Sequence, residues 1–374
     1  MIKQLYFDIA ATTPMDLDVA EIVHRANVEN YGNPSSMHMS GQKSHNIVER
    51  SRTSIAQILN CKTSEIIFTS GGSESNNIVL KGILKKGDHL ITSSYEHPSI
   101  LNLAKHLKKN GVEVSFIKPL ENGSISAKQV QSKIKSNTKL ISIMYVNNEL
   151  GTINPITEIG DIALENKILF HSDTVQFIGK EKLDLSKINI DFATICAHKF
   201  YGPKGIGGLY CKSGIVMDPL IDGGGQENGL RAGTENISSI LGMAKALEIA
   251  NDSLFENKKK ILELENYFIE LLENSNIQYR LNGENRLSGI MNLTFFGVEG
   301  HGLLMNLDMQ GIAISYGSAC SSGSANAPQA LIEIGMKEDE ARCSVRISIG
   351  KMIQKDDIKK LFNSICNIIS RIKK

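Results

Sequence analysis

A lysine beside a turn rich in glycine and proline is the residue best suited to covalent chemistry in this chain. Residues 190–197 are mostly apolar, and His198-Lys199 then lead into Gly202-Pro203-Lys204-Gly205. Buried surroundings at the end of a strand can lower the pKa of a lysine amine, which can then form a Schiff base with an aldehyde cofactor. A lone lysine would more often cap a strand end, but this flanking pattern favours the covalent function.

Two further strand ends carry groups that suit a phosphorylated pyridine cofactor. Asp173 ends the stretch 168–172, where a carboxylate could pair with a protonated ring nitrogen. Gly71-Gly72-Ser73 follow the stretch 66–70 and begin a helix, and backbone amides with a hydroxyl at a helix N-terminus suit a phosphate. Taken alone, Asp173 is better interpreted as a loop or capping residue, and the glycine turn could equally be an ordinary capped turn. The turn matches neither a Walker loop nor a dinucleotide fingerprint.

A cysteine lies among small residues in a long uncharged segment, residues 309–332. The run Gly317-Ser318-Ala319-Cys320-Ser321-Ser322-Gly323 predicts an exposed, mobile loop. An exposed thiol with a pKa of about 8.5 carries appreciable thiolate, so we interpret Cys320 as a nucleophile. The remaining cysteines lie in or beside apolar segments, where a buried structural position is expected: Cys61, Cys196, Cys211, Cys343 and Cys366.

Arg346 stands in a short alternating stretch, residues 344–348. Its guanidinium could hold a substrate carboxylate with two hydrogen bonds. A surface salt bridge is an equally good interpretation of this arginine.

The elements that position these side chains can be predicted from the order of apolar and amphipathic runs along the sequence. Short apolar runs alternate with amphipathic stretches such as 73–85 and 99–109, which predicts an α/β fold with a largely parallel sheet. After about residue 240, apolar residues at helical spacing predict a long helix over 254–271 and another over 358–372. The runs predicted as strands are 65–70, 89–93, 112–117, 139–146, 168–171 and 190–196.

Composition excludes several classes of protein. The 374 residues include 41 Lys and Arg and 40 Asp and Glu, which gives a net charge of +1. A nearly neutral protein is not expected to bind nucleic acid or an anionic membrane through its overall charge. No stretch reads as a membrane span or a signal peptide. Six cysteines without a C-x-x-C pair suggest neither a zinc site nor a disulfide framework, so we expect a cytoplasmic protein.

Taken together and in this order, the segments resemble the cysteine desulfurases of the nitrogen-fixation and iron–sulfur assembly type, which are fold-type-I enzymes dependent on pyridoxal phosphate (PLP). The resemblance runs nearly end to end, and the Cys320 loop is similar to that of the long-loop group. Further motifs that carry it are Ala11-Thr12-Thr13-Pro14, Asn33-Pro34-Ser35-Ser36, Glu96-His97-Pro98, Asn147-Asn148-Glu149 and Arg231-Ala232-Gly233-Thr234-Glu235-Asn236.

The resemblance implies a role for each matching position. Lys199 would be the Schiff-base lysine, and Cys320 would carry the persulfide. Asp173 would pair with the pyridine nitrogen, His97 would stack on the ring and act in catalysis, and Gln176 would bind the phenolic oxygen with Asn148 beside it. Gly72, Ser73, Cys196 and His198 would contact the phosphate. Thr234 would reach the phosphate of a second subunit, which implies a homodimer. Asn33, Asn148 and Arg346 would bind the substrate.

The resemblance also implies the fold and the reaction. A large PLP-binding α/β domain would span 15–256, and a smaller α+β domain would join 1–14 to 257–374 and carry the cysteine loop at about 314–328. The enzyme would convert L-cysteine to L-alanine, with Lys199 taking the Cα proton and Cys320 taking the sulfur for iron–sulfur cluster assembly or another sulfur acceptor. No metal site is expected, although Cys320 could ligate an iron–sulfur cluster.

Some positions depart from the family pattern. Cys196 stands where a serine usually contacts the phosphate, and because a thiol is a weaker donor, one phosphate contact is expected to be softened. Other readings of the sequence are an aminotransferase or a lyase acting on selenocysteine or cysteine sulfinate, a catalytically silent scaffold, and a nucleotide-dependent oxidoreductase. The cysteine loop argues against an aminotransferase, the presence of both Lys199 and Cys320 against a silent scaffold, and the lack of a Gly-x-Gly-x-x-Gly motif against the oxidoreductase.

Overall fold

The computed structural model of the chain describes residues 4–317 and 327–372, and the largest sheet within them has seven strands. Their order is β2-β8-β7-β6-β5-β3-β4. Strands β3 to β7 pair in parallel, whereas β8 is antiparallel to both β7 and β2. This mostly parallel sheet confirms the predicted α/β class. The strands are β2 (Ile66–Thr69), β3 (His89–Ser93), β4 (Glu113–Ile117), β5 (Thr138–Ser142), β6 (Leu169–Asp173), β7 (Phe192–Cys196) and β8 (Gly207–Cys211).

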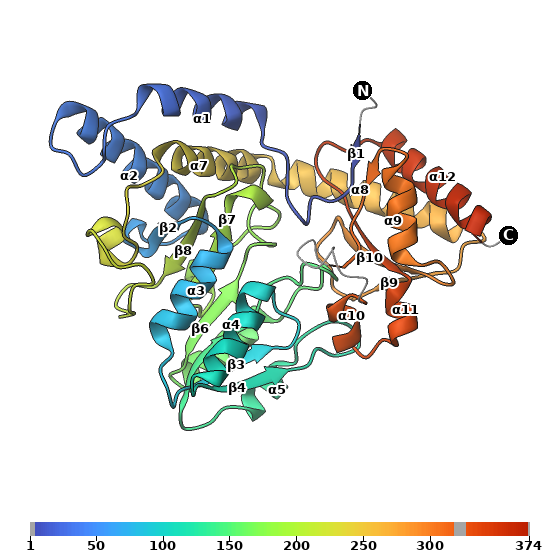
Figure 1. Cartoon of the computed structure of the whole chain (residues 1–374), viewed down its shortest axis with the longest axis horizontal. Coiled ribbons are helices and arrows are strands. Elements are labelled where there is room, and N and C mark those ends of the chain that lie inside the picture. Colours follow the sequence, from blue (N-terminus) through green and yellow to red (C-terminus); the bar gives the residue numbers. More distant parts are fainter. Residues whose placement is uncertain (1–3, 318–326, 373–374) are drawn as a thin grey trace.

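Helices cover this sheet, and their ends follow local sequence signals. The side chain of Asp16 caps α1, and α4 has His97 as its N-cap and Pro98 in its first turn. Helices α1 and α2 pack on α7, and α3 packs on α4, β7 and β8 (Figure 1). The helices are α1 (Leu17–Glu29), α2 (Met39–Leu59), α3 (Gly72–Ile83), α4 (Pro98–Lys109), α5 (Ala127–Ser132), α6 (Ile156–Glu165) and α7 (Ile237–Asp252), with short 3-10 turns η1 (Thr63–Glu65), η2 (Leu185–Lys187), η3 (Ala197–Lys199) and η4 (Gln226–Gly229).

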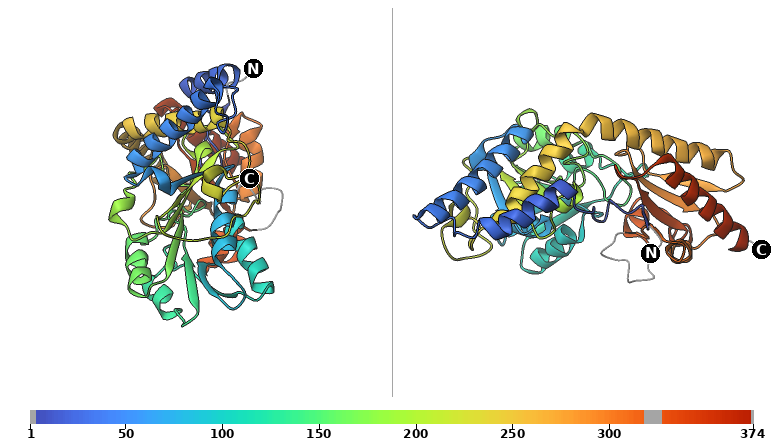
Figure 2. Two further views of the ribbon diagram at one scale, coloured as in Figure 1. Left: turned by 90° about the vertical axis from the view of Figure 1, so that its left-hand side faces the viewer. Right: turned by 90° about the horizontal axis from the view of Figure 1, so that it is seen from above.

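A second group of elements surrounds a smaller antiparallel sheet of order β12-β10-β9. Helix α8 runs from α7 toward α12 (Figure 2), and its buried face includes Leu264, Phe268 and Leu272. Both long helices that the apolar spacing predicted, α8 and α12, are confirmed. The elements are α8 (Leu254–Glu273), β9 (Tyr279–Asn282), β10 (Ile290–Phe295), α9 (Gly300–Asp308), α10 (Gln329–Glu333), α11 (Glu338–Arg342), β12 (Ser344–Ser348) and α12 (Lys355–Ile372), with β1 (Leu5–Tyr6) parallel to β11 (Ile312–Ala313).

Two parts of the large sheet differ from the sequence prediction. Strand β8 was not predicted, because Gly207 and Gly208 at its start lack the side chains by which a strand is predicted. A Cβ atom on Gly207 would lie 2.7 Å from Gly71 Cα, so this close pairing requires glycine. Strand β5 ends at Ser142 rather than residue 146, because its pairing with β3 ends there and the backbone N–H of Met144 donates to Glu96 Oε1 at 2.9 Å.

The carboxyl ends of β2, β3, β5, β6 and β7 meet at one edge of the large sheet. This is the edge where open α/β sheets bind ligands. The segment after β1 joins this edge, because the backbone N–H of Thr13 donates to the carbonyl of His198 at 2.9 Å. Within the described residues, no helix is both long and apolar enough to cross a membrane.

Candidate active site

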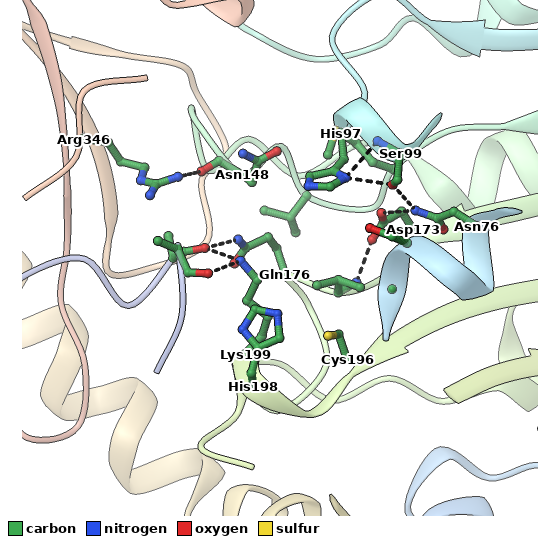
Figure 3. A pocket seen from close by; sticks show the side chains of 17 residues that line it. Asn76, His97, Ser99, Asn148, Asp173, Gln176, Cys196, His198, Lys199 and Arg346 are labelled. Carbon is green, nitrogen blue, oxygen red and sulfur yellow. Dashed lines mark hydrogen bonds between the residues drawn. The ribbon is translucent and has the colours of Figure 1, made fainter. Parts of the chain in front are cut away.

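A cavity of about 240 Å³ lies at this edge of the sheet and collects most of the predicted site residues (Figure 3). Segments from both halves of the chain form its wall, from the N-terminal residues 10–11 to β12. The lining residues are Ala10, Ala11, Gly72, Ser73, Asn76, His97, Ser99, Met144, Val146, Asn148, Asp173, Val175, Gln176, Cys196, His198, Lys199 and Arg346.

Lys199 ends the 3-10 turn η3 that follows β7, and its amine faces the cavity. The Nζ atom donates hydrogen bonds to the carbonyl oxygens of Ala10 at 2.6 Å and Ala11 at 2.8 Å. Burial, with a smaller contribution from the positive charge of Arg346, lowers the pKa of Lys199 from 10.5 to about 8. A substantial neutral fraction at physiological pH makes this amine a competent nucleophile and base.

Asp173 is the last residue of β6, and both of its carboxylate oxygens accept hydrogen bonds. Asn76 Nδ2 donates to Oδ2 at 2.9 Å, and the backbone N–H of Val175 donates to Oδ1 at 3.1 Å. These two donors fix the plane of the carboxylate while it lines the cavity.

His97 lies at the N-terminus of α4, where its ring is held by its neighbour Ser99. The Nδ1 atom lies 2.7 Å from Ser99 Oγ and accepts from the backbone N–H of Ser99 at 3.2 Å. Burial lowers the pKa of His97, the nearby Asp173 carboxylate raises it, and Lys199 lowers it further. The net lowering favours a neutral imidazole.

The amide of Gln176 is held by Ala10 and Lys180, two partners that the sequence did not reveal. Its Nε2 donates to the carbonyl of Ala10 at 2.7 Å, the same oxygen that Lys199 uses. The amine of Lys180 donates to Gln176 Oε1 at 2.5 Å, which sets the orientation of the amide. Burial together with the charges of Lys199 and Arg346 holds the pKa of Lys180 well below its ordinary value.

The predicted phosphate side is formed by the start of α3 and the end of β7. Gly72 and Ser73 begin the helix, and no side chain caps it. Burial raises the pKa of the Cys196 thiol, while the backbone N–H groups of Gly72 and His198 act in the opposite direction. The sulfur of Cys196 therefore lies among donors that would suit an anion.

Arg346 reaches the cavity from the smaller sheet, and it is 1% exposed. Its Nη1 donates to the carbonyl of Asn148 at 2.7 Å, and Nη2 donates to Asp8 Oδ1 at 2.7 Å and to Ser315 Oγ at 3.0 Å. The buried Nε has no hydrogen-bond partner among the described residues. An arginine with an unused donor at a cavity wall suits a carboxylate ligand.

Two predicted residues do not line this cavity, and a third falls outside the described part of the chain. Asn33 lies on an exposed turn, where its Oδ1 accepts from the backbone N–H of Ser35 at 2.9 Å. Thr234 is exposed in the segment before α7. Cys320 lies outside the described residues, and so does most of the segment predicted as a mobile loop. The roles of these three residues remain predictions.

Other cysteine positions divide into two groups. Cys196 and Cys211 are buried, as predicted. Cys61, Cys343 and Cys366 are partly exposed, so the predicted burial is wrong for them. Cys61 and Cys343 lie just after the ends of α2 and α11, and Cys366 lies within α12 beside the buried Ile365.

The donor set of the cavity fits PLP. An amine is present for the aldehyde, a carboxylate for the ring nitrogen, an imidazole for the ring face and an amide for the phenolic oxygen. The start of α3 supplies backbone donors for the phosphate.

Comparisons with known proteins agree with this chemistry. Residues 5–361 match the family described as Aminotransferase class-V. The protein is 41% identical over 379 residues to the cysteine desulfurase IscS of Clostridium botulinum strain Hall, covering 99% of this chain and 96% of that protein. It is 40% identical to the cysteine desulfurase IscS of Dictyoglomus turgidum, covering 100% and 96%.

Solved structures give the same result. A NifS-like protein matches with a TM-score of 0.92 and 34% identity, covering 98% of this chain and 99% of that one. The structure titled "SspA in complex with cysteine" matches with a TM-score of 0.83 and 38% identity, covering 93% and 99%. The fold is therefore that of the fold-type-I PLP enzymes, and the chain belongs to the class-V aminotransferase family and, within it, to the cysteine desulfurases.

Proposed function

We propose that this PLP-dependent cysteine desulfurase converts L-cysteine to L-alanine and receives the sulfur on Cys320 as a persulfide. The observation that carries the proposal is the meeting of Lys199, Asp173, His97 and Arg346 around one cavity. Relatives named cysteine desulfurase IscS, and the related SspA structure with cysteine, support this substrate.

The cavity residues divide the task of holding the cofactor. Lys199 would attach to the aldehyde, and Asp173 would pair with the ring nitrogen. His97 would lie against the ring, and Gln176 would donate to the phenolic oxygen. The phosphate would bind where Gly72, Ser73, Cys196 and His198 gather.

When bound, the cofactor supplies an electron sink for negative charge that develops at the substrate Cα. Lys199 is the group that would take the Cα proton, because its lowered pKa makes a neutral amine accessible near pH 8. Asp173, fixed by Asn76 and Val175, would hold a proton on the ring nitrogen. Arg346 would bind the substrate carboxylate through its unpartnered Nε.

The sulfur step needs a second nucleophile, which we assign to Cys320. Its thiolate would attack the sulfur of the bound cysteine, forming an S–S bond. The Cβ–S bond would break and leave its electron pair on the carbon skeleton, which becomes alanine after protonation. The products are one alanine and one persulfide for each cysteine.

Two variants test this assignment. Lys199→Ala should bind PLP without a covalent link, so borohydride reduction followed by peptide mass spectrometry should find no modified lysine. Cys320→Ala should still bind cysteine but make no protein persulfide, while the partly exposed Cys343→Ala serves as a matched control that keeps it. Persulfide formation by Cys320→Ala at the rate of the unaltered protein would refute the assignment.

We also infer a homodimer and a protein acceptor for the sulfur. Large apolar side chains are exposed at the start of α1 and α2 and between them, with Tyr31 81%, Met37 91% and Met39 86% exposed, which supports a covered surface. Exposure of Thr234 is compatible with reaching a second subunit. Sedimentation analysis tests the dimer, and transfer of labelled sulfur to candidate scaffold or tRNA-thiolation proteins tests the acceptor.

The two-domain division and a cytoplasmic location remain proposals of the same kind. One hydrophobic cluster supports the division, since it joins Phe7 to buried residues from Leu264 onward. Unpaired cysteines among the described residues are compatible with a reducing compartment.

A further inference from the structure

Asn76 lies at the centre of a hydrogen-bond chain that joins two side chains of the cavity. It is a buried residue of α3, and its Nδ2 lies 2.9 Å from Asp173 Oδ2 and 2.9 Å from Ser99 Oγ. Figure 3 shows the chain continuing from Ser99 to His97. Asp173 and His97 are therefore connected through Asn76 and Ser99.

The chemistry of the groups fixes the direction of every bond in this chain. An ionised Asp173 can only accept, so the amide of Asn76 must turn its NH₂ group toward the carboxylate. In this orientation Asn76 Oδ1 accepts a hydrogen bond from the hydroxyl of Thr194, whose Oγ1 lies 2.7 Å away. The second hydrogen of Asn76 Nδ2 is then donated to Ser99 Oγ.

The hydroxyl of Ser99 donates the next hydrogen bond of the chain, to the imidazole of His97. Its hydroxyl oxygen accepts from Asn76, so its hydrogen is available for His97 Nδ1 at 2.7 Å. The backbone N–H of Ser99 donates to the same nitrogen at 3.2 Å. Two donors thus point at Nδ1, which must act as an acceptor and carry no proton.

We propose that Asn76 and Ser99 are positioning residues that fix neutral His97 as the tautomer with its proton on Nε2. In this state Nε2 of His97 is a hydrogen-bond donor and cannot accept a proton. Proton abstraction is therefore left to Lys199, and His97 serves the reaction as a donor. This inference rests on the proposed use of the cavity, but it concerns a proton position that is measurable without turnover.

Protonation of His97 would require Nδ1 to give up both of its donors. The charged and titratable groups that line the same cavity are Asp173, Lys199, His198, Cys196 and Arg346. Only the carboxylate of Asp173 among them favours an imidazolium at this position, and it already accepts from Asn76. The hydrogen-bond chain therefore acts together with burial in keeping His97 neutral.

Neutron diffraction from crystals of the PLP-loaded enzyme near neutral pH tests the tautomer directly. We expect deuterium on Nε2 of His97, none on Nδ1, and the hydroxyl deuterium of Ser99 directed at Nδ1. Deuterium on Nδ1 would overturn the proposal.

A histidine titration by nitrogen NMR supplies a second test in solution. Ser99→Ala removes one donor to Nδ1, so the acid dissociation constant of His97 should fall about three- to tenfold, which means a higher pKa. Ser99→Thr keeps the hydroxyl and should restore the original value, and Asn102→Ala, at an exposed position of α4, should leave it unchanged. An unchanged titration in Ser99→Ala would overturn the proposal, whereas failure of the protein to bind PLP would refute the proposed function instead.

Discussion

The titration of Lys199 links the geometry of the cavity to its chemistry. Burial and the charge of Arg346 lower the pKa of this amine to about 8 in the cofactor-free chain. At pH 7 an amine with that pKa is about 9% neutral, whereas a lysine at 10.5 is only about 0.03% neutral. The cavity therefore raises the neutral fraction of Lys199 by about 300-fold.

Competitive trace labelling of the apoprotein with acetic anhydride measures this fraction. The reagent reacts only with neutral amines, so the labelling rate of Lys199 should rise with pH and level off above a midpoint near 8. Lys105, exposed on α4, is labelled in the same sample and serves as the internal reference. Arg346→Gln should move the Lys199 midpoint upward, because it removes a nearby positive charge.

A labelling midpoint near 10.5 for Lys199 would refute this reasoning. It would mean that the amine is fully hydrated and that the contacts with Ala10 and Ala11 do not hold it inside the cavity. An unchanged midpoint in Arg346→Gln, with the midpoint of the unaltered protein still near 8, would assign the whole shift to burial.

Three further substitutions test separate parts of the site. Cys196→Ser should tighten PLP binding about three- to tenfold in equilibrium dialysis, because a hydroxyl is a better donor than a thiol; equal or weaker binding would contradict the softened phosphate contact. Lys180→Met should weaken PLP binding by a similar factor, since Gln176 loses the donor that orients its amide; unchanged affinity would show that Lys180 has no positioning role. Arg346→Lys should raise the KM for cysteine about tenfold in an alanine-formation assay, because an ammonium cannot keep the contacts of Nη1 and Nη2 while offering a further donor to the carboxylate; an unchanged KM would place the carboxylate site elsewhere.

The strand ends explain why much of the site could be predicted from the sequence. Asp173 ends strand β6 and Lys199 comes three residues after the end of strand β7, and because the two strands are parallel, their carboxyl ends lie at one edge of the sheet. Strand β8 was missed because its paired glycines lack the side-chain pattern by which strands are predicted. Helices α8 and α12 were predicted because their apolar spacing is long and regular.

The supporting residues could not be predicted in the same way. Asn76 resembles a surface residue of an amphipathic helix, and only the fold brings it to Asp173, which is 97 positions away in the chain. Ser99 and Lys180 likewise gain their roles from contacts that no local pattern encodes. A signal was available only for Ser99, because a serine two residues after His97 can hydrogen-bond its ring at a helix start.

Locating the sulfur after one turnover tests the central claim most directly. The PLP-loaded protein is mixed with sulfur-labelled L-cysteine, quenched, and digested for peptide mass spectrometry while alanine is counted. We expect one alanine for each labelled persulfide, with the label on the peptide that contains Cys320. Label on another cysteine, or alanine formed without any protein persulfide, would contradict the account.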